Sequence, residues 1–259
     1  MKHSFIFSTG VSHRAIQISL FTILLAFCGA ITTKAQIMKA DDLEKYAKNK
    51  YGEKWLDAAA NIGKDIQLDK NDNLTYQQVI EAPGKTSQQL YVTMNYWVTS
   101  TFKDKQAITL NDKEAGCIII NATMENIAKH TGGLSQYSVS ITPTIKIDIK
   151  EGKVRVTYTV QSYDVLRDIS GGVLGAIFDK ETGAFDDPKR KKQNITNRDL
   201  YDETWELKTC YPFAAKDGHT AKRTSAKALV MTHAYSQAVM DKIEEAVKHG
   251  VIGNEDEDW

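Results

Sequence analysis

The sequence has no excess of charge of either sign, because 33 lysines and arginines balance 33 aspartates and glutamates. Nucleic-acid-binding domains are typically basic, so this balance gives no support to a DNA or RNA partner. Only the end of the chain, residues 255–258, is strongly acidic. With 42% hydrophobic and 25% charged residues, the composition is that of an ordinary globular protein.

Common catalytic motifs are also absent. The sequence contains no Gly-x-Ser-x-Gly elbow, no His-Glu-x-x-His pair and no phosphate-binding loop. Four histidines follow residue 35, and each stands alone in the sequence. We interpret His130 and His219 as loop residues, His233 as a half-buried helix residue and His249 as a residue at the C-terminal end of a helix. The sequence therefore predicts a protein that is not an enzyme and binds no cofactor.

Cysteine is scarce, with three residues in the whole chain. Neither Cys117 nor Cys210 has a second cysteine or a histidine within three residues, so their spacing does not predict a metal site. In an oxidising compartment the two cysteines could form a disulfide. The alternative is two separate buried thiols that pack as small hydrophobic side chains.

A long apolar run occurs near the N-terminus. Residues 1–35 contain Lys2, Arg14 and Lys34 but no acidic residue, and residues 15–31 are almost entirely apolar. A positive start and an apolar centre are typical of a signal peptide. We found no other stretch that is apolar enough to cross a membrane.

The end of this segment predicts where it is cleaved. Thr33-Lys34-Ala35 places small residues on both sides of a lysine, which predicts cleavage after Ala35 and a mature chain that begins at Gln36. One alternative is lipidation of Cys28, but Phe27 stands where lipid-modifying export needs a small residue. Another alternative is an uncleaved membrane anchor, but the apolar run is shorter than the roughly 20 residues that a transmembrane helix needs. We therefore expect an exported protein, periplasmic or extracellular.

The rest of the sequence predicts one α+β domain. Residues 36–71 form a helical lead-in, residues 72–163 the core, residues 164–223 an irregular insertion, residues 224–250 a final helix and residues 251–259 an acidic tail. Within the core we predict a strand at 74–80, a helix from Thr86 with a capping box to Gln89, and strands at 106–110, 116–124, 137–149 and 153–160. The element order is β-α-β-β-β-β-α.

Alternation in the last two strands predicts a sheet with one buried face. Val139, Ile141, Ile145 and Val156 belong to the apolar set, so we expect helices, including the one that carries Trp97, to pack on that side. The opposite face is polar. Its members form our candidate interaction face: Thr142, Thr144, Lys146, Arg155, Thr157 and Thr159.

Several segments resemble a known family. They are Val79-Ile80-Glu81-Ala82-Pro83-Gly84, then Leu90-Tyr91 and Tyr96-Trp97 on the helix, Asp112-Lys113-Glu114-Ala115-Gly116, and the hairpin from Ile147 to Arg155. Together they resemble a domain-of-unknown-function family of exported Bacteroidetes proteins with a TATA-binding-protein-like (TBP-like) fold. The resemblance covers about residues 72–163. It implies a curved antiparallel sheet with helices on one face, and an exported location, but no activity.

Two functions are favoured, and an enzyme of unrecognised type remains open as a third. The first is a non-catalytic interaction domain of the cell envelope whose partner is an envelope protein, a lipid or a glycan. The alternative is a carrier that holds a small apolar ligand between sheet and helix. We also expect the insertion at 164–223 either to fold back and help shape the binding surface or only to extend the core.

A short acidic loop offers one metal alternative. Asp69-Lys70-Asn71-Asp72-Asn73 has alternating oxygen ligands, as a calcium loop does, but Leu74 stands where such a loop needs glycine. We therefore interpret it as a turn before a strand, and no metal is predicted.

Overall fold

The computed structural model describes residues 37–102, 105–132, 135–169, 191–195, 198–214 and 222–250. The predicted signal segment at 1–35, with Cys28, and the acidic tail at 251–259 lie outside the described residues, as does His219. Within the described ranges, no helix combines the length and the apolar character that a membrane span requires.

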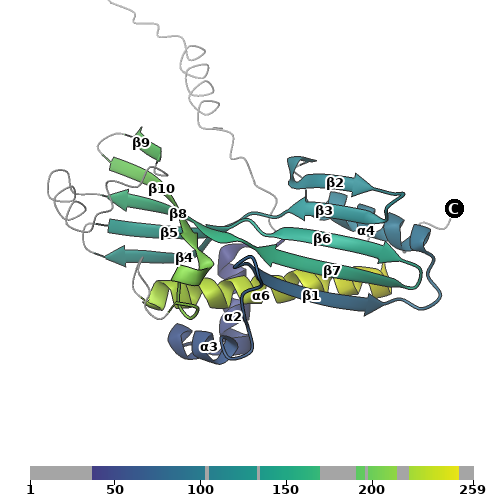
Figure 1. Ribbon diagram of the computed structural model, residues 1–259, viewed down its shortest axis with the longest axis horizontal. Helices are drawn as coiled ribbons and strands as arrows, with labels where there is room; N and C mark the ends of the chain where they lie inside the picture. The colour runs from purple at the N-terminus through teal and green to yellow at the C-terminus, as the bar shows by residue number, and fades with distance from the viewer. Residues whose placement is uncertain are drawn as a thin grey trace, which may run out of the picture. The chain divides into compact units, whose positions relative to one another are not determined.

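Within the described residues, ten strands form two antiparallel sheets of five strands each (Figure 1). The first sheet has the order β1 (Leu74–Glu81), β7 (Lys153–Val160), β6 (Thr144–Lys150), β3 (Cys117–Asn121) and β2 (Ile108–Asp112). The second has the order β4 (Met124–Gly132), β5 (Ser135–Ile141), β8 (Ser162–Ile169), β10 (Arg198–Glu206) and β9 (Lys191–Ile195). The chain passes between the sheets after β3, after β5 and after β7.

In the part of the chain that the structure describes, four α-helices accompany the sheets: α2 (Ala40–Tyr51), α3 (Trp55–Ile62), α4 (Ser87–Thr101) and α6 (Lys222–His249). Short 3₁₀ turns are η1 (Lys105–Ala107) and η3 (Leu207–Thr209). Helix α6 runs along both sheets and packs on β4, β1 and β7, while α4 packs on β6 and β7 (Figure 1). Because α2, α3 and α4 also contact α6, this helix lies at the centre of the helical layer.

Local signals account for the start of α4. The Thr86 hydroxyl accepts a hydrogen bond from the Gln89 backbone N–H at 3.2 Å, and the Gln89 side chain accepts one from the Thr86 N–H at 2.9 Å. This is the predicted capping box, and it is confirmed. The hairpin between β6 and β7 turns at Gly152 with φ of 69°, as its glycine indicates.

The α+β class and the antiparallel pairing are confirmed, but the prediction of one sheet is wrong. The predicted strand at 137–149 is two strands, because Thr142 and Pro143 carry the chain from β5 in the second sheet to β6 in the first. Likewise the predicted strand at 116–124 ends at Asn121, and Met124 begins β4. The helical lead-in is also divided, since Gly52 (φ 100°) ends α2 before α3 begins.

The prediction of an irregular insertion at 164–223 is wrong for its described parts. They contain most of β8, together with β9 and β10, which form three adjacent strands of the second sheet. Tyr163, Val165 and Trp205 from β8 and β10 are almost fully buried. The segment therefore extends the core with ordered sheet structure.

The core lies between the sheets and the helices. Val139, Ile141, Ile145 and Val156 are fully buried, and Trp97 of α4 is 5% exposed, so the predicted inner face is confirmed. Cys117 and Cys210 are both buried and are not joined by a disulfide in this structure, which corresponds to the alternative of two separate buried thiols.

Candidate functional site

Five of the six predicted face residues lie together on the face of the first sheet that points away from the helices. Thr144 is paired in register with Thr159, and Lys146 with Thr157, across β6 and β7. Arg155 is paired with Asp148 two residues further along. Because side chains two apart on a strand point to the same side, these residues form one polar surface. We call it the outer face of the first sheet.

Asp148 organises the charges on this face. Lys146 Nζ lies 2.8 Å from its Oδ1, and Arg155 donates from Nε and Nη2 to its Oδ2 at 3.1 and 2.8 Å. Burial acts to raise the pKa of the Asp148 carboxyl, but hydrogen bonds and charge from Lys146 and Arg155 together lower it below its ordinary value. Asp148 is therefore a stable carboxylate that holds two cationic side chains in place.

Cys117 stands next to this ion-pair group, paired in register with Asp148. Burial, with the negative charge of Asp148, raises the pKa of the Cys117 thiol. Since the thiolate is the reactive form of cysteine, this environment disfavours a nucleophilic role for Cys117.

The sixth predicted residue, Thr142, does not lie with the other five. It sits at the crossover between β5 and β6, and its hydroxyl donates to Asp164 Oδ2 of β8 at 3.2 Å. Its hydroxyl also lies 3.4 Å from that of Thr123, at the crossover between β3 and β4. Two residues further along, Thr144 donates to Asn121 Oδ1 at 3.1 Å. These contacts join the outer faces of the two sheets into one polar surface, which we call the outer surface.

The second sheet carries a hollow that the sequence did not predict. Its volume is about 610 Å³, and its lining is polar apart from two residues. It is lined by Thr123, Glu125, Asn126, Ser138, Ser140, Thr142, Asp164, Val165, Leu166, Asp202, Glu203 and Thr204. Among the described residues, neither lysine nor arginine belongs to this lining, so we call it the acidic hollow.

Hydrogen bonds between neighbouring strands fix the floor of the acidic hollow. Asn126, with φ of 60°, lies where the pairing of β4 with β5 shifts register. Its N–H donates to Ser140 Oγ at 3.2 Å, and its side-chain oxygen accepts from the Ser138 hydroxyl. A bulge of this kind re-aims side chains at the edge of a sheet. Here it directs an amide and two hydroxyls into the hollow.

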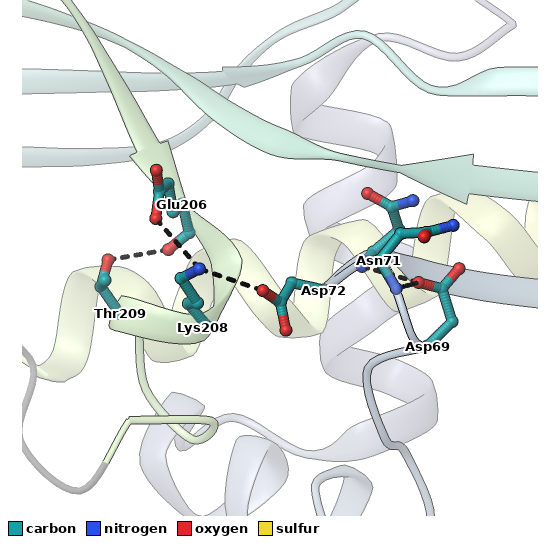
Figure 2. Close-up of polar contacts among 7 residues, drawn as sticks. Asp69, Asn71, Asp72, Glu206, Lys208 and Thr209 are labelled. Carbon is teal, nitrogen blue, oxygen red and sulfur yellow. Dashed lines mark hydrogen bonds and ion pairs between the residues drawn. The ribbon is translucent and has the colours of Figure 1, made fainter.

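The predicted turn before β1 is confirmed and connects to the end of β10 (Figure 2). Asp69 Oδ1 accepts from the N–H groups of Asn71 and Asn73 at 2.8 and 3.0 Å. These backbone bonds lower the pKa of the Asp69 carboxyl. Lys208 lies between Asp72 (3.0 Å) and Glu206 (3.6 Å), as Figure 2 shows. The arrangement is that of a structural turn and a tie between the two sheets.

Residues 76–164 match the family described as a domain of unknown function (DUF4468) with TBP-like fold. Over these residues the chain is similar to that family. Both the family and the TBP-like fold that the sequence resembled are thereby confirmed.

Two solved structures resemble the chain. A TBP-like protein from Parabacteroides distasonis is 13% identical, with a TM-score of 0.42 over 69% of this chain and 95% of its own. A DUF4468 family protein from Bacteroides ovatus is 12% identical, with a TM-score of 0.39 over 68% of this chain and 88% of its own. No curated protein matches the sequence.

The segment that matches the DUF4468 family contains all six predicted face residues but not the whole of the acidic hollow. Asp202, Glu203 and Thr204 of β10 line the hollow from beyond residue 164. The segment predicted as an irregular insertion therefore extends the core and also shapes the surface. A sequence search limited to the domain would miss this side of the hollow.

A second polar group lies in the core, outside the outer surface. His233 of α6 has its ring centroid 5.3 Å from those of Tyr51 and Tyr76, and Tyr76 in turn contacts the ring of Tyr158 at 6.0 Å. Burial lowers the pKa of His233 to about 4. The predicted half-buried helix position of His233 is confirmed, whereas His130 lies in β4 instead of a loop. These rings join α2, β1 and α6.

Proposed function

We propose that this chain is an exported, non-catalytic binding protein of the cell envelope, and that the outer surface of its two sheets contacts the partner. An envelope protein, a lipid or a glycan is the class of partner that an exported location makes available. The observation that carries the proposal is the acidic hollow of about 610 Å³ on a sheet face away from the helices. Hollows of this size are typical of binding sites.

The contacts on the outer surface favour a role in binding a partner over a role in catalysis by proton transfer. Asp148 is held by Lys146 and Arg155, Asp164 accepts from Thr142, and Asn126 is fixed by Ser138 and Ser140. Side chains that hold one another in place form a preorganised surface, which lowers the entropic cost of binding.

The competing function, a carrier with an apolar cavity between sheet and helix, has less support. Ile145 and Tyr158 on the inner face of the first sheet are fully buried, and Trp97 of α4 is 5% exposed. Large side chains thus fill the layer where such a carrier would hold its ligand. The outer surface is therefore the better candidate.

A bulky substitution in the acidic hollow tests the binding site. Thr204 is exposed and lines the hollow, so Thr204→Trp should block it with little change in stability. Asp57→Trp, at an exposed position of α3, is the matched control. In a pull-down from the native envelope, followed by mass spectrometry of proteins and lipids, Thr204→Trp should lose a partner that wild type and Asp57→Trp retain. If all three proteins recover the same partners, the hollow is not the site.

Export is tested separately. N-terminal sequencing of the protein from its native host should give a mature chain that begins at Gln36. A retained Met1, or a lipid on Cys28, would contradict cleavage after Ala35.

A further inference from the structure

We propose that the acidic hollow binds a glycan chain that carries N-acetylated amino sugars. This inference rests on the proposed function, because it names the class of partner that the hollow takes. Three observations support it: the register that aligns the lining residues in rows, the hydrogen-bonding groups that those residues present, and an exposed leucine among them.

The strand register arranges the floor of the hollow in two rows across β5, β8 and β10. The first row is Ser140, Asp164 and Thr204, and the second is Ser138, Leu166 and Asp202. Side chains paired in register point to the same side of a sheet, so the members of each row lie next to one another. Since neighbouring strands lie about 4.8 Å apart, each row is roughly 10 Å long, which is the scale of a short oligosaccharide.

Hydroxyls are the commonest functional group in the lining. They belong to Thr123, Ser138, Ser140, Thr142 and Thr204. A hydroxyl can both donate and accept a hydrogen bond, so this surface suits a ligand that is itself made largely of hydroxyls. A sugar chain is such a ligand along its whole length. Thr204 is exposed and its hydroxyl has no partner among the described residues, so it is available to a sugar hydroxyl.

Asn126 and Asp164 supply a donor and an acceptor for the same ligand. The Asn126 side-chain oxygen accepts from the Ser138 hydroxyl, whereas its NH₂ group has no partner in the part of the chain that the structure describes. Asp164 accepts from Thr142 through Oδ2, and its Oδ1 has no partner within the described ranges. The contacts to Ser138 and Thr142 hold both side chains in place, which lowers the entropic cost of binding.

The other carboxylates of the lining are not needed for this contact. Glu125 and Asp202 take part in other interactions, and Asp202 is paired in register with Lys191 of β9. Glu203 pairs with Arg167 at 3.7 Å. Recognition of a neutral glycan therefore uses Asp164 and the uncharged groups, and it does not depend on the net charge of the hollow.

An acetamido group matches three neighbouring side chains of the hollow. Its carbonyl oxygen accepts from the Asn126 NH₂ group, its N–H donates to Asp164 Oδ1, and its methyl group packs on Leu166, which is 40% exposed. Leu166 stands two residues from Asp164 on the same side of β8, and it is paired with Ser138, whose hydroxyl holds Asn126. One acetamido group can therefore reach all three.

The same lining disfavours other classes of partner. A lipid tail needs apolar walls, but Val165 is 2% exposed, which leaves Leu166 as the exposed apolar side chain of the described lining. An anionic headgroup needs a lysine or an arginine, and neither occurs among the described lining residues. Protein partners bind chiefly through tryptophan, tyrosine and arginine, which this described lining also lacks.

The first test is calorimetric titration of the mature wild-type protein with chitotriose, a short chain of N-acetylglucosamine. The titration should show one saturable site. Cellotriose is the matched control ligand, because it has the same linkage with a hydroxyl in place of each acetamido group. It should bind about tenfold more weakly, since it lacks a hydrogen bond and a methyl contact. No saturable binding of chitotriose, or equal binding of the two sugars, overturns the proposal.

The second test removes the assigned contacts one at a time. Asn126→Asp keeps the oxygen that accepts from Ser138 and tolerates the φ of 60°, but it replaces the donor with an acceptor. It should weaken chitotriose binding about tenfold or more. Leu166→Ala should weaken it about fivefold, because the methyl contact is lost. The matched control is Leu110→Ala on β2, which is 42% exposed and lies outside the hollow, and it should bind as the wild type does.

Circular dichroism should show that the variants are folded. If folded Asn126→Asp and Leu166→Ala bind chitotriose as tightly as the wild type, the sugar does not occupy the hollow and the proposal is refuted. The envelope pull-down with Thr204→Trp separates this inference from the proposed function. If Thr204→Trp loses an envelope protein that the wild type retains, and chitotriose does not bind the wild type, the hollow is a protein-binding site and the glycan alone is refuted.

Discussion

Acid should destabilise this protein through His233. The ring lies between Tyr51 of α2 and Tyr76 of β1, and burial, aided by the positive charge of Lys50, lowers its pKa from 6.5 to about 4. The unfolded chain therefore binds a proton at this site more readily than the folded chain does. It follows that the stabilising effect is complete above pH 6.5 and is lost as the pH falls toward 4.

The size of the effect follows from that difference. A fall in the pKa of His233 from 6.5 to about 4 means that the free energy of unfolding differs by about 3 kcal/mol between the neutral and the protonated form of the histidine. Because the His233 side chain is half-buried, solvent screens part of this effect, and we expect the free energy of unfolding to fall by about 2 kcal/mol. This is a large fraction of the stability of a typical domain, so the midpoint of unfolding should move measurably.

The assay compares chemical denaturation of wild type with His233→Phe between pH 7 and pH 4. Phenylalanine keeps the ring contacts with Tyr51 and Tyr76 but cannot take up a proton. Carboxylates titrate in the same pH range in both proteins. The difference between the two proteins in how the free energy of unfolding changes with pH therefore reports the protonation of His233. The control is His249→Gln, at an exposed position in the last turn of α6. If wild type and His233→Phe lose stability in parallel, the histidine is not held in the neutral form as we infer.

Much of the first sheet could be predicted because its signals are local. The capping box at Thr86 and Gln89 needs residues three apart, and the hairpin at Gly152 needs one positive φ. The alternation of buried and exposed residues along β7 depends on strand geometry alone. Each of these signals can be read within a few residues of sequence, and each corresponds to a feature of the structure.

The division into two sheets could not be predicted from alternation, because the side-chain period does not change when a strand passes from one sheet to the other. Val139 and Ile141 point inward in the second sheet, and Ile145 continues the same pattern in the first. Pro143 was the available signal, since proline cannot donate to a sheet and marks an edge or a break. For the same reason alternation predicts Thr142 on the face of the first sheet, whereas it lies at the crossover between the two sheets.

Strands β8 and β10 were missed for a different reason. Both place a charged residue inward, where an alternating strand usually has an apolar one. Arg167 is 8% exposed, lies over the ring of Tyr137 at 5.3 Å and pairs with Glu203 at 3.7 Å. Neither strand therefore shows a clean apolar face in the sequence. The ion pair forms only after the two strands align, so the acidic hollow beside it could not be predicted either.

Three further predictions concern the packing and the outer face. Trp97→Ala should cost about 3–5 kcal/mol, because the side chain is 5% exposed, and an unchanged melting temperature would show that α4 does not pack as described. Gly116→Ala should cost about 2 kcal/mol, because φ is 60° and a Cβ would lie 2.7 Å from the Ile149 carbonyl oxygen; full stability in denaturant titration would contradict this backbone geometry. Lys146→Glu with Arg155→Glu puts two further carboxylates beside Asp148, so we expect a loss of about 1–2 kcal/mol, where isolated exposed changes cost less. Adding Asp148→Lys should restore most of it, since the central charge is then reversed as well, and a triple variant no more stable than the double would show that Asp148 does not organise this face.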